Sequence, residues 1–339
     1  MSRLRVGDVV EVLGAREILA TLDEKGELEN LPFMPEMLKF CGRRMMVHKV
    51  AHKLCEVITG DGGLHWLNNA VHLTDARCSG QAHGGCQTAC SLYWKEAWVR
   101  QIPRTERDRT PVAVVADTTA IDIAVLERAT RKVPDVDGSE RFACQATEIL
   151  RATSGHIRFW EAKQYLADLR SGNAGLVEVG RGILFHLFNV YQRWSQRFLP
   201  HQLLIKEGLP WGFVKGRAVD RTPTEHLDLR LGEVVRVKSK DEITRTLNAK
   251  KLNRGMGFEE EMARFCGRTS RVLRRVDRCI DEKTGKMLTM KNPCIVLEGI
   301  VCQGVYHSNC PRQYVSFWRE AWLERVQDDR RQATDSRGF

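Results

Sequence analysis

The sequence contains no run of 18 uncharged apolar residues, the length that a membrane-spanning helix requires. Its first residues, MSRLRVGDVVEV, lack the apolar core of a secretory signal peptide. We therefore expect a cytoplasmic protein without a transmembrane segment. The chain has 11 cysteines, and cytoplasmic thiols in a pattern bind metal or do chemistry more often than they form disulfides.

The sequence also lacks the common catalytic motifs. It has no H-E-x-x-H, no P-loop and no G-x-S-x-G. The glycine pair in GRGILF, residues 180–185, does not have the G-x-G-x-x-G spacing of a dinucleotide-binding loop, and we expect no strand before it. These absences favour a binding protein over an enzyme.

The composition is that of a folded protein, with 42% hydrophobic and 28% charged residues. A chain of 339 residues is long enough for two or three domains. The net charge of +10 favours anionic partners. This charge is spread along the chain rather than gathered in a tail, so it does not by itself indicate nucleic-acid binding.

Two segments of the chain share a pattern of metal-ligating residues. Residues 78–98 read CSGQAHGGCQTACSLYWKEAW, and residues 302–322 read CQGVYHSNCPRQYVSFWREAW. Both contain C-x4-H-x2-C, which supplies three of the four ligands of a tetrahedral zinc site. The ligand residues are Cys78, His83 and Cys86 in the first segment and Cys302, His307 and Cys310 in the second.

These segments belong to a longer internal repeat. Residues 5–43 align without a gap onto residues 230–268, and both stretches end in Phe-Cys-Gly-Arg. The repeat unit of about 95 residues is larger than a solenoid repeat, so it indicates a duplicated domain. We call the two copies the first and the second repeat.

Each repeat offers two further cysteines as the fourth ligand, Cys41 or Cys55 in the first and Cys266 or Cys279 in the second. A hairpin that turns near Gly285 would set Cys302 opposite residue 267, beside Cys266. We therefore predict two Zn²⁺ sites, with Cys55 and Cys279 as alternates. An iron–sulfur cluster stays open for the same residues. The predicted ligands are Cys41, Cys78, His83 and Cys86 for one site and Cys266, Cys302, His307 and Cys310 for the other.

Within each repeat the local signals are mostly those of strands. Residues 7–13 and 232–238 follow the alternation of a half-buried strand, and residues 47–58, 71–77 and 295–301 also predict strands. We expect each repeat to close with a short helix that carries Trp94 and Trp98, or Trp318 and Trp322. The fold class is α+β, with two small SH3-like β-barrels that flank a mainly helical middle domain. The predicted domains are residues 1–102, 111–215 and 226–327, followed by a flexible tail at 328–339.

The middle domain has helical periodicity over residues 159–169 and 176–199. The longer segment carries an apolar stripe flanked by arginines, which would either pack against the barrels or contact a partner or membrane surface. Cys144, Glu148 and His156 are the residues of this domain that could form a catalytic site, although one thiol and one imidazole are a weak signal. Cys90, Cys144 and Cys294 look like packing residues.

Several blocks of the second repeat resemble a group of uncharacterised bacterial proteins with duplicated cysteine-rich modules. The blocks are RTPTEHLDLRLGEVVRVKSKDEI at 221–243, VLRRVD at 272–277, DEKTGKM at 281–287 and FWREAWL at 317–323. The resemblance implies a bacterial, cytoplasmic protein of the kind encoded in cell-surface polysaccharide or secondary-metabolite loci. It implies no activity.

The leading hypothesis is a non-catalytic, metal-stabilised binding or scaffold protein that engages a peptide or protein, accessory to a biosynthetic pathway. A second hypothesis is a nucleic-acid-binding protein, for which the basic run at residues 268–278 is the best local candidate. A third is a tailoring enzyme or accessory subunit with its site in the middle domain. The sequence leaves the oligomeric state open.

Overall fold

The computed structural model describes four stretches of the chain, residues 4–56, 63–106, 120–218 and 221–326. The chain divides into two compact units that are each built from several segments. Unit 1 contains Met1–Leu199, Arg278–Thr289 and Cys302–Val315, and unit 2 contains Pro200–Asp277, Met290–Val301 and Ser316–Phe339. Two segments of the second repeat thus belong to unit 1. The predicted tail at 328–339 lies outside the described residues.

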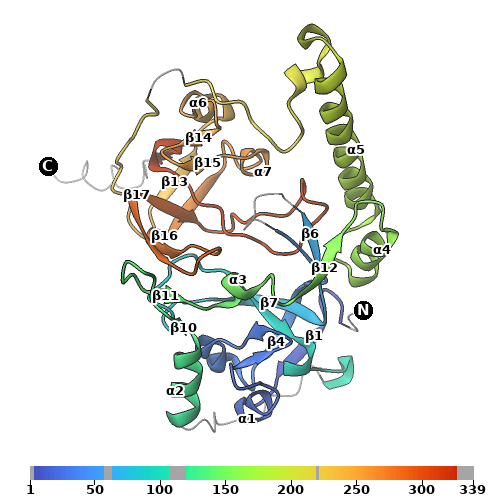
Figure 1. Cartoon of the computed structure of the whole chain (residues 1–339), viewed down its shortest axis with the longest axis vertical. Coiled ribbons are helices and arrows are strands. Elements are labelled where there is room, and N and C mark those ends of the chain that lie inside the picture. Colours follow the sequence, from blue (N-terminus) through green and yellow to red (C-terminus); the bar gives the residue numbers. More distant parts are fainter. Residues whose placement is uncertain (1–3, 57–62, 107–119, 219–220, 327–339) are drawn as a thin grey trace, which may run out of the picture. The chain divides into compact units, whose positions relative to one another are not determined.

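Unit 1 contains a curled, antiparallel five-stranded sheet in the order β8-β7-β4-β1-β9 (Figure 1). Val10 in β1 pairs with Met45 on one side and with Gln101 on the other. The sheet's strands are β1 Val9–Val12, β4 Arg44–Val50, β7 Ala70–Arg77, β8 Ser91–Lys95 and β9 Val99–Gln101. The strand predicted over residues 47–58 is interrupted, because β4 ends at Val50 and β5 (Lys53–Cys55) begins a separate sheet.

The smaller elements of unit 1 comprise short strands and helices. The strands are β2 Glu27–Leu28, β3 Leu31–Pro32, β5 Lys53–Cys55, β6 Leu64–Leu67, β10 Arg131–Lys132, β11 Arg141–Phe142 and β12 Thr153–Ile157. The α-helices are α1 Ala15–Leu19, α2 Ala120–Ala129, α3 Gln145–Glu148, α4 Ala162–Ser171 and α5 Leu176–Phe198. The 3₁₀ turns are η1 Pro35–Phe40, η2 Glu96–Trp98 and η3 Arg104–Glu106.

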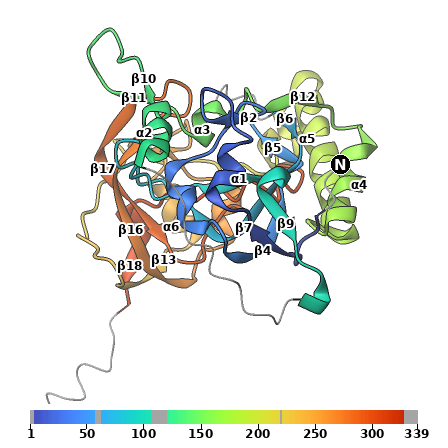
Figure 2. The ribbon, with the colours of Figure 1, turned by 90° about the horizontal axis from the view of Figure 1, so that it is seen from below.

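A second curled, antiparallel sheet has the order β17-β16-β13-β18, and Figure 2 shows its strands together. It belongs to unit 2 except at residues 278–280 and 287–289, which belong to unit 1. Its strands are β13 Val234–Val237, β16 Thr269–Ile280, β17 Met287–Leu297 and β18 Leu323–Arg325. The hairpin turn predicted at 281–286 is confirmed, because Asp281 and Lys286 share a backbone hydrogen bond across it. The other elements are η4 His201–Leu203, η5 Ile205–Gly208, α6 Lys240–Arg245, β14 Leu252–Asn253, β15 Met256–Gly257, α7 Glu260–Ala263 and η6 Glu320–Trp322.

The predicted tryptophan helix is wrong. Trp94 lies in strand β8, where it pairs with Val71, and the chain returns to strand structure at Val99, which pairs with Val12. Only the single 3₁₀ turn η2, which includes Trp98, separates the two strands. Pairing with distant strands on both sides therefore overrides the helical spacing of the two tryptophans.

The two tryptophans anchor the core of each sheet in the same way. Trp94 and Trp98 are fully buried, and the ring of Phe33 meets both edge-on at 6.3 and 5.2 Å. In unit 2, Phe258 meets Trp318 and Trp322 at 6.2 and 5.4 Å. Each second tryptophan also donates its ring N–H to a threonine, Thr21 at 3.0 Å and Thr246 at 2.8 Å. Aromatic packing with a satisfied indole N–H fixes the end of each curled sheet.

The helices predicted between the repeats are confirmed as α4 and α5, and both belong to unit 1. Strand β12 pairs with β6 of the first repeat, His156 opposite His65. Asp168 of α4 accepts a hydrogen bond from Lys53 Nζ at 2.6 Å, and both side chains are fully buried. The described residues from 120 to 199 thus belong to the same unit as the first repeat, whereas residues 200–218 belong to unit 2. A separate middle domain stays a prediction.

The buried pair offers a test of this packing. We expect Asp168→Asn to lower the free energy of unfolding by about 3–5 kcal/mol, because it leaves the Lys53 ammonium buried without its partner charge. Arg100→Gln is the control, since Arg100 pairs with Glu11 but is 59% exposed, and it should cost less than about 1 kcal/mol. Urea denaturation of both variants measures the difference, and equal losses would contradict the account.

Candidate metal centre

Residues 78–90 and 302–314, which we call the first and second clasp loops, have the same backbone structure. Each loop is closed by a hydrogen bond from the N–H of its first residue to the C=O of its last, Cys78 to Cys90 at 2.9 Å and Cys302 to Tyr314 at 2.8 Å. Within the loops, the histidine N–H donates to the glycine C=O, at 3.2 Å in the first loop and 2.9 Å in the second. The repeated ligand pattern thus corresponds to a repeated loop geometry.

One glycine in each clasp loop is required by close approach of the backbone. Gly80 has φ +75° and Gly304 has φ +69°, in the left-handed region. A Cβ on Gly80 would lie 1.8 Å from the carbonyl oxygen of Cys86, and one on Gly304 would lie 2.4 Å from that of Cys310. Glycine therefore lets the last ligand of each C-x4-H-x2-C fold back toward the first.

This close approach can be tested with a matched pair of substitutions. Gly85 also has a positive φ, +71°, but a Cβ there meets nothing within 4 Å. We expect Gly85→Ala to cost about 1–2 kcal/mol from backbone strain alone. Gly80→Ala adds a clash with backbone and should cost at least about 2 kcal/mol more. Thermal or urea denaturation gives both values, and equal effects would show that the loop does not need glycine at position 80.

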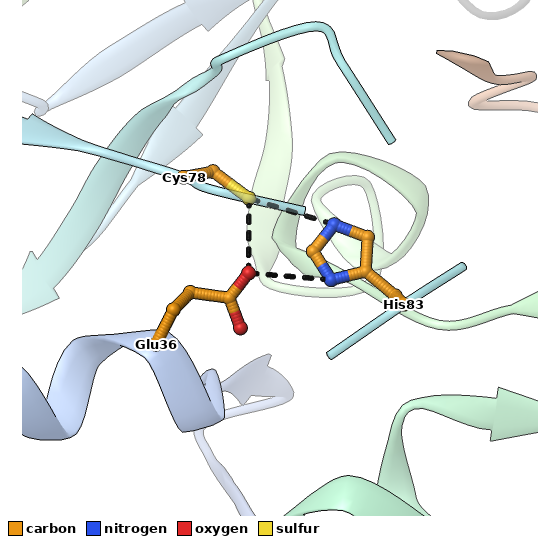
Figure 3. Close-up of side chains that lie close together, drawn as sticks. All are labelled: Glu36, Cys78 and His83. Atoms are coloured by element: carbon orange, nitrogen blue, oxygen red, sulfur yellow. Dashed lines mark hydrogen bonds and ion pairs between the residues drawn. The ribbon is translucent and has the colours of Figure 1, made fainter. Parts of the chain in front are cut away.

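Three side chains of the first repeat converge into a group that could hold a metal ion, Glu36, Cys78 and His83 (Figure 3). Glu36 comes from η1, Cys78 follows the end of β7, and His83 lies in the first clasp loop. Cys78 Sγ lies 3.3 Å from Glu36 Oε1 and 3.5 Å from His83 Nε2, while His83 Nδ1 lies 3.4 Å from Glu36 Oε1. All three ligand atoms lie within 4.8 Å of one another.

The chemistry of this group fits a bound cation. Sulfur and nitrogen ligands of one tetrahedral zinc, at about 2.3 and 2.0 Å from the metal, lie roughly 3.5 Å apart, which is the distance from Cys78 Sγ to His83 Nε2. In the described part of the chain, Glu36 Oε2 is buried and has no hydrogen-bond partner. Glu36 suits either a ligand or the carboxylate that orients a metal-bound histidine through its other ring nitrogen.

The electrostatics of the group agree with this assignment. Burial raises the pKa of the Cys78 thiol well above its ordinary value, and the Glu36 carboxylate raises it further. Burial lowers the pKa of His83, and Glu36 partly offsets that shift. A dication among these groups favours the thiolate and the neutral imidazole, the forms in which both residues bind metal.

The sequence predicted Cys78 and His83 as ligands of one site, and the structure brings them together. The sequence analysis did not identify Glu36. The signal was present, because Glu36 and Glu261 occupy equivalent positions in the two repeats. Cys41 and Cys86 lie outside the group formed by the described residues. Burial raises the pKa of Cys41 to about 11, and Cys86 is buried with its sulfur 3.3 Å from Thr88 Oγ1. The predicted four-residue set stays a prediction.

In the second repeat the structure separates the predicted residues between units. Cys302, His307 and Cys310 belong to unit 1, whereas Cys266 belongs to unit 2. The strand pairing of the hairpin does not extend to Cys302, and the predicted set of Cys266, Cys302, His307 and Cys310 stays a prediction. Strand β17 ends at Leu297, and the chain then passes a residue with positive φ, Gly299.

The second clasp loop instead contacts Cys55 of the first repeat. The backbone N–H of Cys55 donates to Cys310 Sγ at 3.0 Å. Burial by itself raises the pKa of Cys310, but hydrogen bonds from the Cys55 side chain and from backbone N–H groups outweigh it and lower the pKa to about 6. The pKa of Cys55 is raised well above its ordinary value, first by its hydrogen bond to Cys310 and then by burial. Cys310 is therefore the thiolate of this pair.

The residues considered for catalysis have different partners. Glu148 pairs with Lys132 and Arg151. Burial raises the pKa of the Cys144 thiol to about 12, so it is a poor nucleophile at neutral pH. His156 is exposed on β12 and contacts His65, with ring centroids 5.4 Å apart. These observations do not favour the enzyme hypothesis.

The basic run at 268–278 is largely engaged within unit 2. Arg275 pairs with Glu320 at 2.8 Å, Arg271 donates to the carbonyl of Gly232 at 3.2 Å, and Arg268 lies over the ring of Phe265. Arginines with protein partners of this kind do not form a free row for phosphates. The nucleic-acid hypothesis gains no support from this strand.

Comparison of the chain with models of known protein families and with curated proteins finds no match. Among the described residues, none of the helices combines the length and the apolarity needed to cross a bilayer. The function of the protein is therefore argued from its own geometry.

Proposed function

We propose that the protein is a non-catalytic, metal-stabilised binding protein, and that helix α5 docks an acidic amphipathic segment of a partner protein. The observation that carries this proposal is the exposed apolar face of α5, the long helix drawn in yellow-green in Figure 1. Contiguous exposed apolar patches are rare on soluble proteins and mark interaction sites.

The exposed face follows the helical repeat. Its residues are spaced by three or four positions, so they share one side of the helix. Each is between 37% and 61% exposed. They are Leu184, Leu187, Tyr191, Trp194 and Phe198. Tyr191 and Trp194 lie 6.3 Å apart and Trp194 and Phe198 5.4 Å apart, measured between ring centroids.

The opposite side of α5 is fixed to unit 1. Phe185 stacks on Tyr306 at 4.9 Å, and His186 stacks on Phe159 at 3.6 Å. Asn309 also donates to the carbonyl of Glu178 at 3.2 Å. The apolar face is thus presented by a rigid helix, which lowers the entropic cost of binding.

The positive charge beside the apolar face of α5 favours an acidic partner. Arg193 and Arg197 are exposed beside the aromatic residues, and Arg197 lies 5.7 Å from the centroid of the Phe198 ring. A segment that places apolar side chains at helical spacing against α5, with Asp or Glu beside them, complements both features. Aromatic and arginine side chains are also the commonest energetic centres of protein interfaces.

The metal part of the proposal concerns the stability of the two repeats, which we infer to be SH3-like barrels. The clasp-loop ligands are two thiols and one imidazole in each repeat, a set that suits zinc. Two zinc ions per chain would add the free energy of metal binding to the stability of the folded repeats.

Zinc binding by both repeats predicts a stoichiometry. Purified protein should contain about two zinc ions per chain by elemental analysis, and Cys86→Ser or Cys310→Ser should each reduce this to about one. Cys294→Ser is the matched control, because Cys294 is equally buried but lies outside the clasp loops, and it should retain both ions. Well-folded wild-type protein without metal would contradict this part of the proposal.

The docking face can be tested with a phage-displayed library of randomised helical peptides selected on the full chain. Selected peptides should carry apolar residues at helical spacing with Asp or Glu beside them, and should bind Leu187→Glu and Trp194→Glu at least about tenfold more weakly. Leu231→Glu is the control, since Leu231 is 76% exposed but lies in unit 2.

Two outcomes would contradict the docking proposal. One is a set of selected peptides that bind the α5 variants as tightly as the wild type. The other is binding of the chain to phosphatidylserine vesicles, lost in the α5 variants, with no peptide selected. The second result would assign α5 to a membrane surface.

A further inference from the structure

We propose that the second clasp loop binds a zinc ion through Cys302, His307 and Cys310, and that Cys55 of the first repeat is the fourth ligand. All four residues belong to unit 1. This inference rests on the metal-binding part of the proposed function. It takes the fourth ligand from the first repeat, in place of Cys266 of the second. It joins residues of the two repeats at one metal ion.

The contact between Cys55 and Cys310 is the first observation. Cys55 N lies 3.0 Å from Cys310 Sγ, and both side chains are buried, at 7% and 3% exposure. Backbone N–H groups that point at a sulfur are typical of thiolates that bind metal. Arg312, two residues after Cys310, donates to the carbonyl of Cys55 at 3.3 Å. Both the N–H and the C=O of Cys55 are therefore hydrogen-bonded to residues of the second clasp loop.

The position of Cys302 is the second observation. Its backbone N–H donates to the carbonyl of Tyr314 at 2.8 Å, the bond that closes the loop containing Cys310. Cys302 Sγ also accepts a hydrogen bond from the backbone N–H of Gly304 at 3.4 Å. The loop that contacts Cys55 thus carries both Cys302 and Cys310, and a closed site of three thiolates and one imidazole is a common structural zinc site.

His307 completes the set through the geometry of its loop. The second clasp loop has the same closing hydrogen bonds as the first, where His83 Nε2 lies 3.5 Å from the sulfur of Cys78. His307 stands in the position of His83 in the repeated C-x4-H-x2-C pattern. The repeated sequence position and loop backbone therefore assign the imidazole ligand of this site to His307.

The first clasp loop shows the reciprocal arrangement, which is an independent observation. Gln87 N donates to the carbonyl of Arg278 at 3.1 Å, and Arg278 N donates to Gln87 Oε1 at 3.1 Å. These bonds join the residues next to Cys86 and Cys279, and both cysteines are buried in unit 1. Cys55 and Cys279 lie 14 and 13 residues after the Phe-Cys-Gly-Arg cysteines Cys41 and Cys266. Each clasp loop thus takes its fourth cysteine from the other repeat, and Glu36 orients His83.

The experiment compares four single substitutions in the full-length chain by elemental analysis. Cys55→Ser and Cys279→Ser should each lower the zinc content from about two ions to about one. Cys41→Ser and Cys266→Ser are the matched controls, since they remove the other cysteine of each repeat, and should retain about two. Loss of zinc from the Cys266→Ser protein, with retention in the Cys55→Ser protein, would overturn the inference.

A second measurement applies if a variant does not fold. Wild-type protein is alkylated with iodoacetamide before and after chelation, and modified cysteines are identified by mass spectrometry. Cys55, Cys302 and Cys310 should become reactive together on chelation, while the reactivity of Cys266 does not change with the metal. A Cys55–Cys310 disulfide, or release of Cys266 together with Cys302, would overturn the inference.

The outcomes separate this inference from the proposed function. Metal-free wild-type protein would end the metal part of the proposed function and the inference together. Two zinc ions whose binding depends on Cys266 rather than Cys55 would contradict this inference but not the proposed function. Binding of peptides to α5 is measured independently of both.

Discussion

A buried hydrogen bond from the backbone N–H of Cys55 to the sulfur of Cys310 joins the two repeats of this chain. The donor comes from the end of a short strand in the first repeat and the acceptor from the second clasp loop. A buried thiolate is costly unless it is paired with hydrogen-bond donors or a metal ion. The pair therefore constrains where the second clasp loop lies in unit 1, the unit to which the segment Cys302–Val315 belongs.

The same constraint links the proposed metal centre to the proposed docking face. Tyr306 and Asn309, both within the second clasp loop, contact helix α5 through Phe185 and Glu178. A metal ion that fixes this loop thus also supports the inner side of α5. Its outer side remains apolar, aromatic and flanked by arginines. In this account the metal stabilises the surface that binds the partner and takes no part in a reaction.

Local patterns in the sequence predicted part of this structure well. The alternation that includes residues 9–12 and 234–237 predicted the strands β1 and β13, and the helical period at 176–199 predicted α5. Both patterns reflect burial on one face of a single element. The tryptophan pairs at 94 and 98 also have helical spacing, yet Trp94 lies in a strand. The partner strands of that segment come from residues far away in the sequence, which no local pattern reveals.

The candidate site shows the same limit. The C-x4-H-x2-C pattern and its duplication predicted the two clasp loops, and the recurrence of glutamate at 36 and 261 could have indicated Glu36. The neighbour of Cys310 could not be found in this way. The register of the hairpin predicts a neighbour for Cys302 only if strand β17 continues to that residue. Strand β17 ends at Leu297, and Cys302–Val315 belongs to unit 1. Contact with Cys55 depends on tertiary structure.

The most direct test is a crystal structure of the zinc-loaded protein with anomalous diffraction data collected at the zinc absorption edge. The account predicts an anomalous peak about 2.3 Å from the sulfur atoms of Cys55, Cys302 and Cys310. It also predicts that His307 supplies the remaining ligand. A peak bounded by Cys266 in place of Cys55, or no peak at the second clasp loop, would contradict it.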